Sequence, residues 1–84
     1  MKKQEFTVDL TGVRLAKALH QRLADVLPVP AEYGRNYDAL FDFLTEFGPN
    51  LRIVFTHAKS APATLRRVCT DAMAETPGLE IEFR

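Results

Sequence analysis

Residues 33–42 read YGRNYDALFD, and this stretch predicts where one helix begins and which way it faces. Asn36 has a side chain of the kind that caps helix N-termini. The apolar positions after it recur at i, i+3, i+4 and i+7, which is the spacing of a stripe facing a core. They are Tyr37, Leu40, Phe41 and Leu44. Gly48 and Pro49 follow, so the sequence predicts a helix over residues 37–47.

The same predicted helix carries two aspartates, Asp38 and Asp42, on a face beside the apolar stripe, together with Thr45. Asp38 lies in the first turn, where the helix dipole favours a negative charge. Asp42 lies beyond that turn, and like charges four residues apart repel each other by roughly 0.2–0.5 kcal/mol. A fold gains little stability from such a pair of like charges. The pair therefore favours the hypothesis that this helix face binds a basic partner. The alternative is an ordinary solvated helix face, the usual place for such charges.

The pattern YG-x-N-x-DAL-x-D resembles the inhibitory helix, with its lead-in, of the barstar family of intracellular ribonuclease inhibitors. Its defined positions here are Tyr33, Gly34, Asn36, Asp38, Ala39, Leu40 and Asp42. The close match begins at Leu19-His20-Gln21, includes Leu23 and runs without a gap to Asp42. Outside this segment the chain is similar to the family in the order of its elements. The resemblance implies a barstar-like fold and a protein that blocks the basic active site of a microbial, barnase-like ribonuclease.

The resemblance also assigns roles to single residues. Asp42 matches the family's aspartate that enters the nuclease active site, where its carboxylate stands in for the substrate phosphate. Asp38 and Thr45 match positions on the same inhibitory face, and Asp71 falls where the family has a supporting glutamate. The expected partner-binding residues are Tyr33, Gly34, Asn36, Asp38, Ala39, Asp42, Thr45, Phe47 and Asp71.

Several positions depart from the family's pattern. Arg35 stands where the family has an acid, and Glu32 stands where it has a contacting tyrosine. Phe41 and Phe47 replace tryptophans. The links on both sides of the predicted second strand are short, so we expect the family's extra short helix there to be reduced or absent. Barstar is acidic, whereas this chain is neutral overall, so electrostatic steering of a basic partner should be weaker.

Charge is distributed unevenly over the 84 residues, although eleven basic and eleven acidic side chains cancel. Residues 26–50 carry one basic side chain, Arg35, and four acidic ones. This local acidity argues against nucleic acid as the direct ligand, because phosphate binding needs clustered Lys and Arg. A single cysteine excludes an internal disulfide, and neither a membrane-spanning run nor an export signal is evident. We therefore expect one domain over residues 1–84, cytoplasmic and monomeric when free.

Apolar alternation predicts strands near residues 6–10 and 79–83, with a third, unalternated apolar strand at 51–55 between them. Helices are expected over residues 12–27 and 37–47, and another is opened by Ser60 and Pro62 and stopped by Pro77-Gly78. Strands separated by helices pair in parallel through right-handed crossovers. The fold class predicted is therefore two-layer α/β, with a three-stranded parallel sheet in order 1-2-3 packed against about three helices.

Catalysis and metal binding find little support in the sequence. Paired carboxylates can act as acid and base, but glycosidases hold them roughly 5–10 Å apart across a cleft, which one convex helix face does not provide. No His/Cys/Asp cluster has metal-ligand spacing, and no phosphate-binding or nucleophile motif is present. His20 and Cys69 lie on apolar stripes and are interpreted as packed core residues, with one ring nitrogen of His20 satisfied. We expect no catalytic residue, no metal and no cofactor.

The sequence thus favours a barstar-like inhibitor of a secreted or toxin-type ribonuclease, an immunity-like role without membrane or direct nucleic-acid contact. The first alternative is a barstar-fold interaction module for a different basic protein. The second is a hydrolase that uses the aspartate pair. An apolar interface around Phe43 and Phe47 would distinguish itself by an on-rate that does not respond to salt.

Overall fold

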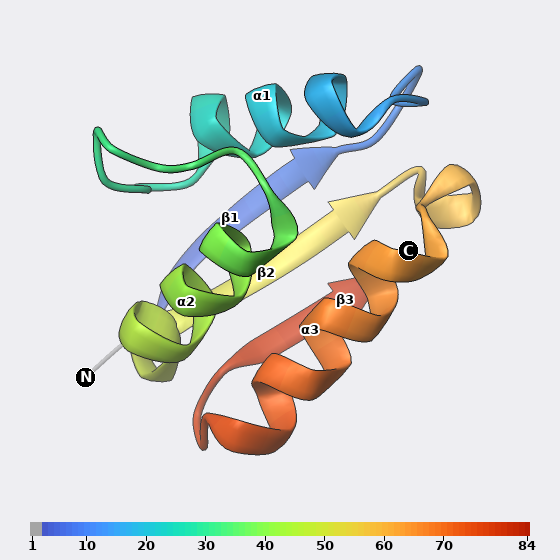
Figure 1. The fold of residues 1–84 in the computed structure, drawn as a ribbon. Coiled ribbons are helices and arrows are strands. Elements are labelled where there is room, and N and C mark those ends of the chain that lie inside the picture. Colours follow the sequence, from blue (N-terminus) through green and yellow to red (C-terminus); the bar gives the residue numbers. More distant parts are fainter. Residues whose placement is uncertain (1–2) are drawn as a thin grey trace.

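The computed structural model describes residues 3–84 and has three strands, three helices and two short 3₁₀ turns in those residues. Figure 1 shows that the helices all lie on one side of the sheet, so the fold has two layers. In chain order the elements are β1 (Gln4–Asp9), α1 (Ala16–Val26), α2 (Tyr37–Phe47), η1 (Gly48–Asn50), β2 (Leu51–Thr56), η2 (Ala58–Ser60), α3 (Ala63–Glu75) and β3 (Glu80–Phe83).

The sheet is parallel throughout and has the strand order β1-β2-β3, which confirms the predicted topology. The central strand β2 pairs along its whole length with β1, from Gln4↔Leu51 to Asp9↔Thr56. Its residues Ile53, Val54 and Phe55 are all buried, which explains why this strand lacks polar alternation. Val54 points away from the helices, yet it is only 3% exposed between its cross-strand neighbours Thr7 and Glu82.

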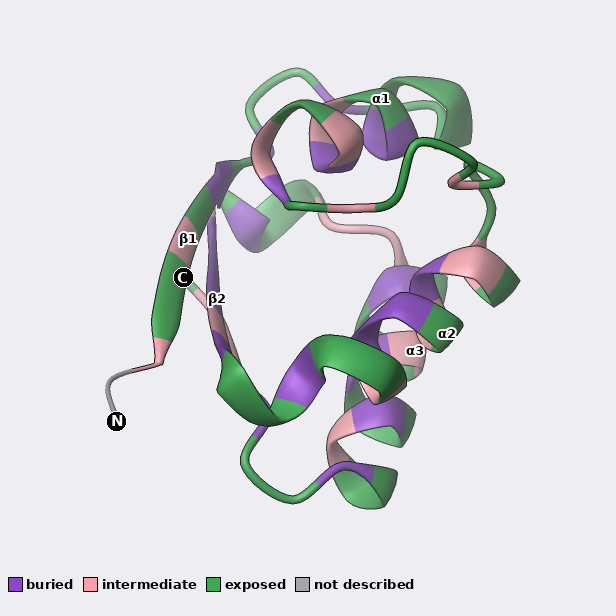
Figure 2. Ribbon diagram, turned by 90° about the vertical axis from the view of Figure 1, so that its left-hand side faces the viewer, coloured by how far each residue is buried: buried purple, intermediate pink, exposed green. Residues whose placement is uncertain are grey.

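The hydrophobic core fills the space between the sheet and the helices, where the buried segments face in Figure 2. Phe55 of β2 stacks on Phe83 of β3, with ring centroids 5.0 Å apart, and so joins the core to the edge strand. The strands contribute Val8, Ile53 and Phe55, and the helices contribute Leu19, Leu23, Leu40, Leu44, Leu65, Cys69 and Ala72. Truncating such a buried Leu to Ala typically costs about 2–5 kcal/mol, so these leucines contribute substantially to the stability of the fold.

The first helix begins at Ala16, four residues later than predicted. Gly12 has a left-handed backbone with φ of 73°, and the Asp9 carboxylate accepts a hydrogen bond from the Thr11 amide at 2.8 Å. These local bonds form a turn instead of a first helical turn. Ala16, which opens this helix, is exposed, and the helix packs on the core through Leu19, His20 and Leu23.

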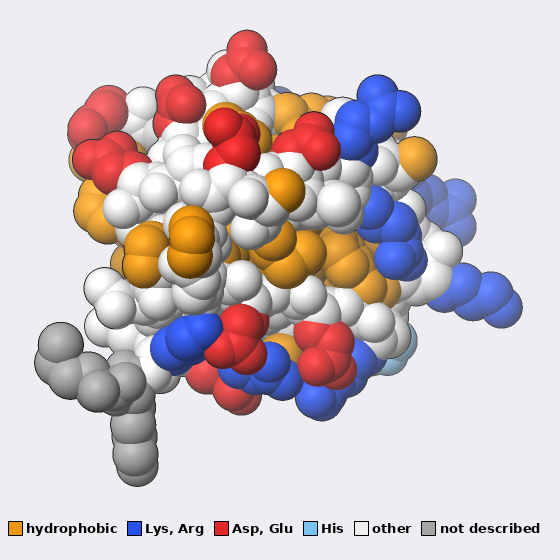
Figure 3. All heavy atoms as spheres, turned by 90° about the horizontal axis from the view of Figure 1, so that it is seen from below, with side chains coloured by type: hydrophobic (Ala, Val, Ile, Leu, Met, Phe, Trp, Pro, Cys, Tyr) orange, Lys and Arg blue, Asp and Glu red, His pale blue; other side chains and the backbone are white. Residues whose placement is uncertain are grey.

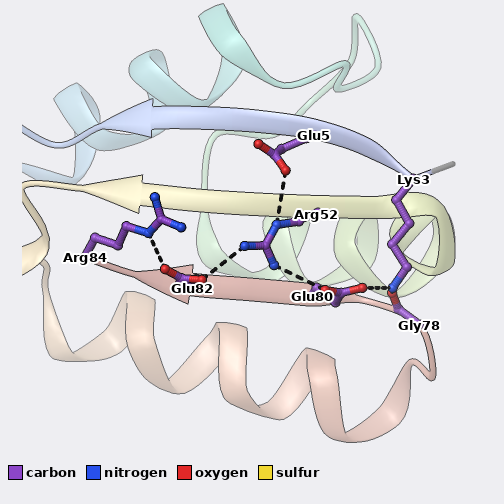
Figure 4. Close-up of polar contacts among 7 residues, drawn as sticks. All are labelled: Lys3, Glu5, Arg52, Gly78, Glu80, Glu82 and Arg84. Atoms are coloured by element: carbon purple, nitrogen blue, oxygen red, sulfur yellow. Dashed lines mark hydrogen bonds and ion pairs between the residues drawn. The ribbon is translucent and has the colours of Figure 1, made fainter.

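A ladder of charged side chains crosses the face of the sheet that carries no helix (Figure 4). Arg52 lies at its centre and contacts Glu5 at 3.1 Å, Glu80 at 3.2 Å and Glu82 at 3.1 Å. Lys3 pairs with Glu80, and Arg84 pairs with Glu82. The Lys3 contact lowers the pKa of Glu80, and the Arg84 contact lowers that of Glu82. We refer to these six residues as the charge ladder.

Between β2 and α3 the chain contains only η2, a single 3₁₀ turn of three residues. This short link agrees with the expectation that an extra helix at this place is reduced. His57 precedes the turn on the surface, with its Nδ1 atom 2.9 Å from the Asp9 carboxylate. The link therefore lies beside the end of β1.

Candidate functional site: the acidic face of α2

The start of α2 is fixed by its cap. The side-chain oxygen of Asn36 accepts a hydrogen bond from the Ala39 amide at 2.7 Å, and the Asn36 carbonyl accepts one from Leu40 at 3.0 Å. Both satisfy groups at the first helical turn. The helix runs from Tyr37 to Phe47, as the sequence predicted. Because the cap sets the helical phase, it also sets the direction in which the aspartates of α2 point.

The apolar side of α2 packs on the core. Leu40 and Leu44 are each 1% exposed, and Tyr37 and Phe41 are half-buried. Phe43 is also buried, so it is not available to contact a partner. The suggestion that Phe43 belongs to an apolar interface is therefore wrong. Its ring lies 5.4 Å from that of Phe47, which is 48% exposed at the end of the helix.

The outer side of α2 presents carboxylates without internal partners. Asp38 and Asp42 are exposed, and within residues 3–84 neither carboxylate makes an ion pair or a hydrogen bond. Asp71 is exposed on α3, which packs beside α2. Figure 3 shows acidic side chains gathered over the helical side of the molecule. We call the exposed Asp38 and Asp42 of α2, together with the exposed Asp71 of the neighbouring α3, the acidic face.

Thr45 lies close to the acidic face but its hydroxyl is already used. It donates to the Phe41 carbonyl at 3.0 Å, and the Asp42 carbonyl lies at 3.2 Å. Such bonds to the preceding turn are usual for threonine within a helix. Thr45 therefore lies on the same helix face as the aspartates, and its hydroxyl is hydrogen-bonded within its own helix.

The segment that leads into α2 passes close to the helix start. A Cβ atom on Gly34 would lie 3.3 Å from the Asn36 side-chain amide and 3.5 Å from the Ala39 Cβ. Glycine at this position thus permits a tight approach rather than a left-handed turn. The left-handed residue is Arg35, with φ of 55°.

Tyr33 ties this lead-in to α1. Its hydroxyl lies 2.8 Å from Nδ1 of His20, which is 1% exposed, and the Tyr37 ring meets the His20 ring edge-on at 4.9 Å. Burial raises the pKa of Tyr33 to about 12 and lowers that of His20. The prediction of a packed histidine with one satisfied ring nitrogen is confirmed. Among residues 3–84 its Nε2 atom has no hydrogen-bond partner.

Comparison with known families connects this arrangement to a function. The family model described as Barstar (barnase inhibitor) matches residues 3–83, which is nearly the whole chain. The chain belongs to the barstar family. A search of curated proteins finds no match. Membership in the barstar family confirms the resemblance seen in the sequence, and the family's description is of an inhibitor rather than an enzyme.

The nine expected partner-binding residues occupy three places in this barstar-family fold. Three lie in the lead-in and its cap, one lies on α3, and the others lie on α2. Four have exposed side chains that make no polar contact within residues 3–84: Asp38, Asp42, Phe47 and Asp71. Ala39 is half-buried, and Tyr33, Asn36 and Thr45 form internal hydrogen bonds. The left-handed backbone of Arg35 was not foreseen, because no local sequence pattern requires it.

The remaining reactive groups have ordinary packing roles. Cys69 is buried, and burial raises the pKa of its thiol to about 12, so the nucleophilic thiolate is not populated near neutral pH. Across residues 3–84 no group of three or more His, Cys, Asp or Glu side chains is placed to hold a metal ion. No helix in that range is long and apolar enough to cross a membrane.

Proposed function

We propose that this chain inhibits a barnase-like ribonuclease by placing the acidic face of α2 against the enzyme's basic active site. The observation that carries the proposal is the pair of exposed carboxylates on α2, unpartnered within residues 3–84, in a chain of the barstar family. Asp42 would lie among the enzyme's cationic groups, and Asp38 and Asp71 would pair at its flanks. No bond is made or broken in this function.

The geometry of α2 suits such a role because the helix is formed before binding. Its cap at Asn36 and its buried Leu40 and Leu44 hold the aspartates on a rigid element. A preformed anion loses less side-chain and backbone freedom on binding than a flexible loop does. Removing one charge from a buried pair costs roughly 2–5 kcal/mol, an effect for which barnase with barstar is itself a measured example.

An enzymatic role is weaker on physical grounds. Acid–base division of labour requires two carboxyls whose environments push their pKa values apart. Asp38 and Asp42 share one exposed helix face, so their surroundings are alike. We therefore propose binding without catalysis.

We further propose that the chain is one domain and is monomeric when free. Its proposed place is the cytoplasm, where it would act on a secreted or toxin-type ribonuclease.

Affinity capture tests the proposal. The immobilised chain is incubated with the secreted proteins of the organism that encodes it, and the captured protein is assayed for RNA hydrolysis with and without added chain. Barnase serves as a second, defined probe. We expect a captured ribonuclease whose activity the chain inhibits, and no capture by Asp42→Ala. A captured basic protein that does not cleave RNA would instead favour an interaction module with a different partner.

A further inference from the structure

Two residues other than glycine adopt a left-handed backbone within residues 3–84, and they differ in how their side chains are used. They are Arg35, with φ of 55°, and His57, with φ of 54°. A residue with a Cβ atom is disfavoured in this conformation, so it persists only where something compensates. His57 contacts the Asp9 carboxylate at 2.9 Å. Arg35 is exposed and makes no hydrogen bond or ion pair in the described part of the chain.

Arg35 is close in sequence to acids that could pair with it. It precedes the cap residue Asn36 and lies three residues from both Glu32 and Asp38, which are exposed. Neither acid forms an ion pair with it. Arg35 therefore brings a positive charge that is unpaired within residues 3–84 into the segment directly before the helix that carries Asp38 and Asp42.

This charge conflicts with a purely basic partner. In the proposed complex the acidic face lies against clustered cations, and an unpaired guanidinium beside them would repel those cations and be desolvated. Arginine binds a carboxylate through two parallel N–H bonds, which is both strong and geometrically selective. One acidic side chain on the enzyme opposite residue 35 would turn the repulsion into an attraction.

We propose that Arg35 is a specificity residue, and that the partner ribonuclease carries a carboxylate opposite it at the rim of its basic active site. This inference rests on the proposed function and narrows it to a class of ribonuclease. A ribonuclease with a lysine or arginine at that rim position would be rejected, because selectivity arises from repulsion as well as attraction.

The sign of one substitution separates this proposal from its alternative. If Arg35 only faces the enzyme's cations, Arg35→Gln removes a repulsion and binding becomes tighter. If Arg35 is paired with a carboxylate, Arg35→Gln weakens binding about tenfold, and Arg35→Glu weakens it about a hundredfold or more. Arg35→Lys keeps the charge but loses the bidentate geometry, so its affinity should fall between those of the wild type and Arg35→Gln.

The probe is the ribonuclease captured by the wild-type chain and inhibited by it, and affinities are measured by titration calorimetry. Arg14→Gln is the control, because Arg14 is exposed before α1 and likewise has no ion pair in residues 3–84. Arg35→Gly separates the backbone from the charge, since it should raise the melting temperature while weakening binding as Arg35→Gln does. Replacing the enzyme's rim carboxylate with lysine should restore binding of Arg35→Glu.

Each outcome decides between the two levels of the proposal. Weaker binding by Arg35→Gln, with restoration by the charge swap, supports the specificity role. Equal or tighter binding by Arg35→Gln, while Asp42→Ala still abolishes binding, overturns the inference and leaves the inhibitor function standing. Failure to capture an inhibited ribonuclease overturns both.

Discussion

On the helix-free face of the sheet every glutamate of the charge ladder lies within pairing distance of a basic side chain, whereas the aspartates of α2 have no such neighbour among residues 3–84. A single side chain, that of Arg52, contacts Glu5, Glu80 and Glu82. Asp38 and Asp42 are also exposed, but neither carboxylate forms an ion pair within residues 3–84. The sheet uses its acids to join strands, whereas the aspartates of α2 join nothing within residues 3–84, which fits the proposed binding role.

The difference has a physical reason. Exposed ion pairs contribute little one by one, but a single arginine shared among three strands constrains their relative register. On α2 the like charges repel slightly, so they do not help the fold. An acid that its own fold does not use is a better indicator of a binding face than acidity alone.

The largest expected effect comes from breaking the acidic face. Asp42→Ala should cost on the order of 2–5 kcal/mol of affinity for the captured ribonuclease, because the enzyme's cations lose their counter-charge. The free protein should be as stable as the wild type or slightly more stable, by roughly 0.2–0.5 kcal/mol, since a repulsion is removed. Titration calorimetry and thermal melts measure the two quantities.

Asp25→Ala is the matched control for this prediction, because Asp25 is an exposed aspartate on α1, where it accepts a hydrogen bond from Gln21. Its affinity should equal that of the wild type. A melting temperature that drops sharply in Asp42→Ala would mean that Asp42 supports the fold, and the proposed inhibitor would lose its central residue.

The salt dependence of the association rate should distinguish a charged interface from an apolar one. Raising ionic strength from about 0.01 to 0.15 M shortens the screening length from roughly 30 to 8 Å, so association of the acidic face with a basic enzyme should slow, by about tenfold. Stopped-flow association at several salt concentrations measures this. An on-rate that stays constant would indicate an apolar contact, for which Phe47 is the exposed residue of α2.

The contrast between local and long-range information explains what the sequence could predict. The bounds of α2 depend on Asn36, the apolar stripe and Gly48, all within one segment, and they were predicted correctly. The strand order followed from the apolar centre of β2, and it was also correct. Both depend on patterns that neighbouring residues already contain.

Features formed between distant segments were not predicted. The ladder depends on which residues of β3 lie opposite Arg52, and this register is set by packing of the whole sheet. The bond from His20 to Tyr33 joins α1 to a loop thirteen residues away. The late start of α1 depends on the hydrogen bond that the Asp9 carboxylate accepts from the Thr11 amide, which competes with helix formation. For the candidate site, sequence named the acids but not their lack of partners, which only the fold shows.

Breaking the charge ladder should have a smaller effect, and on stability alone. Arg52→Met keeps an apolar stem next to Val54 but removes the guanidinium that three glutamates share. We expect the melting temperature to fall by a few degrees and affinity for the captured ribonuclease to stay the same. Loss of affinity with unchanged stability would show that the helix-free face also contacts the partner.

The smallest expected effect is the acid dependence of the ladder. The folded pKa values of Glu80 and Glu82 lie below the ordinary value of 4.5. Because their pKa values are depressed, the stability they contribute is fully present above about pH 4.5 and is lost as pH falls through the lowered values. Burial also lowers the pKa of His20, so a separate loss should begin below its ordinary value of 6.5. Urea midpoints between pH 7 and 3 should therefore fall in two stages. Arg52→Met should reduce the more acidic stage only in part, because Lys3 and Arg84, the larger causes of the lowered pKa values, remain. A variant whose lower stage is as steep as that of the wild type would show that Arg52 contributes nothing to the lowered pKa values of these glutamates.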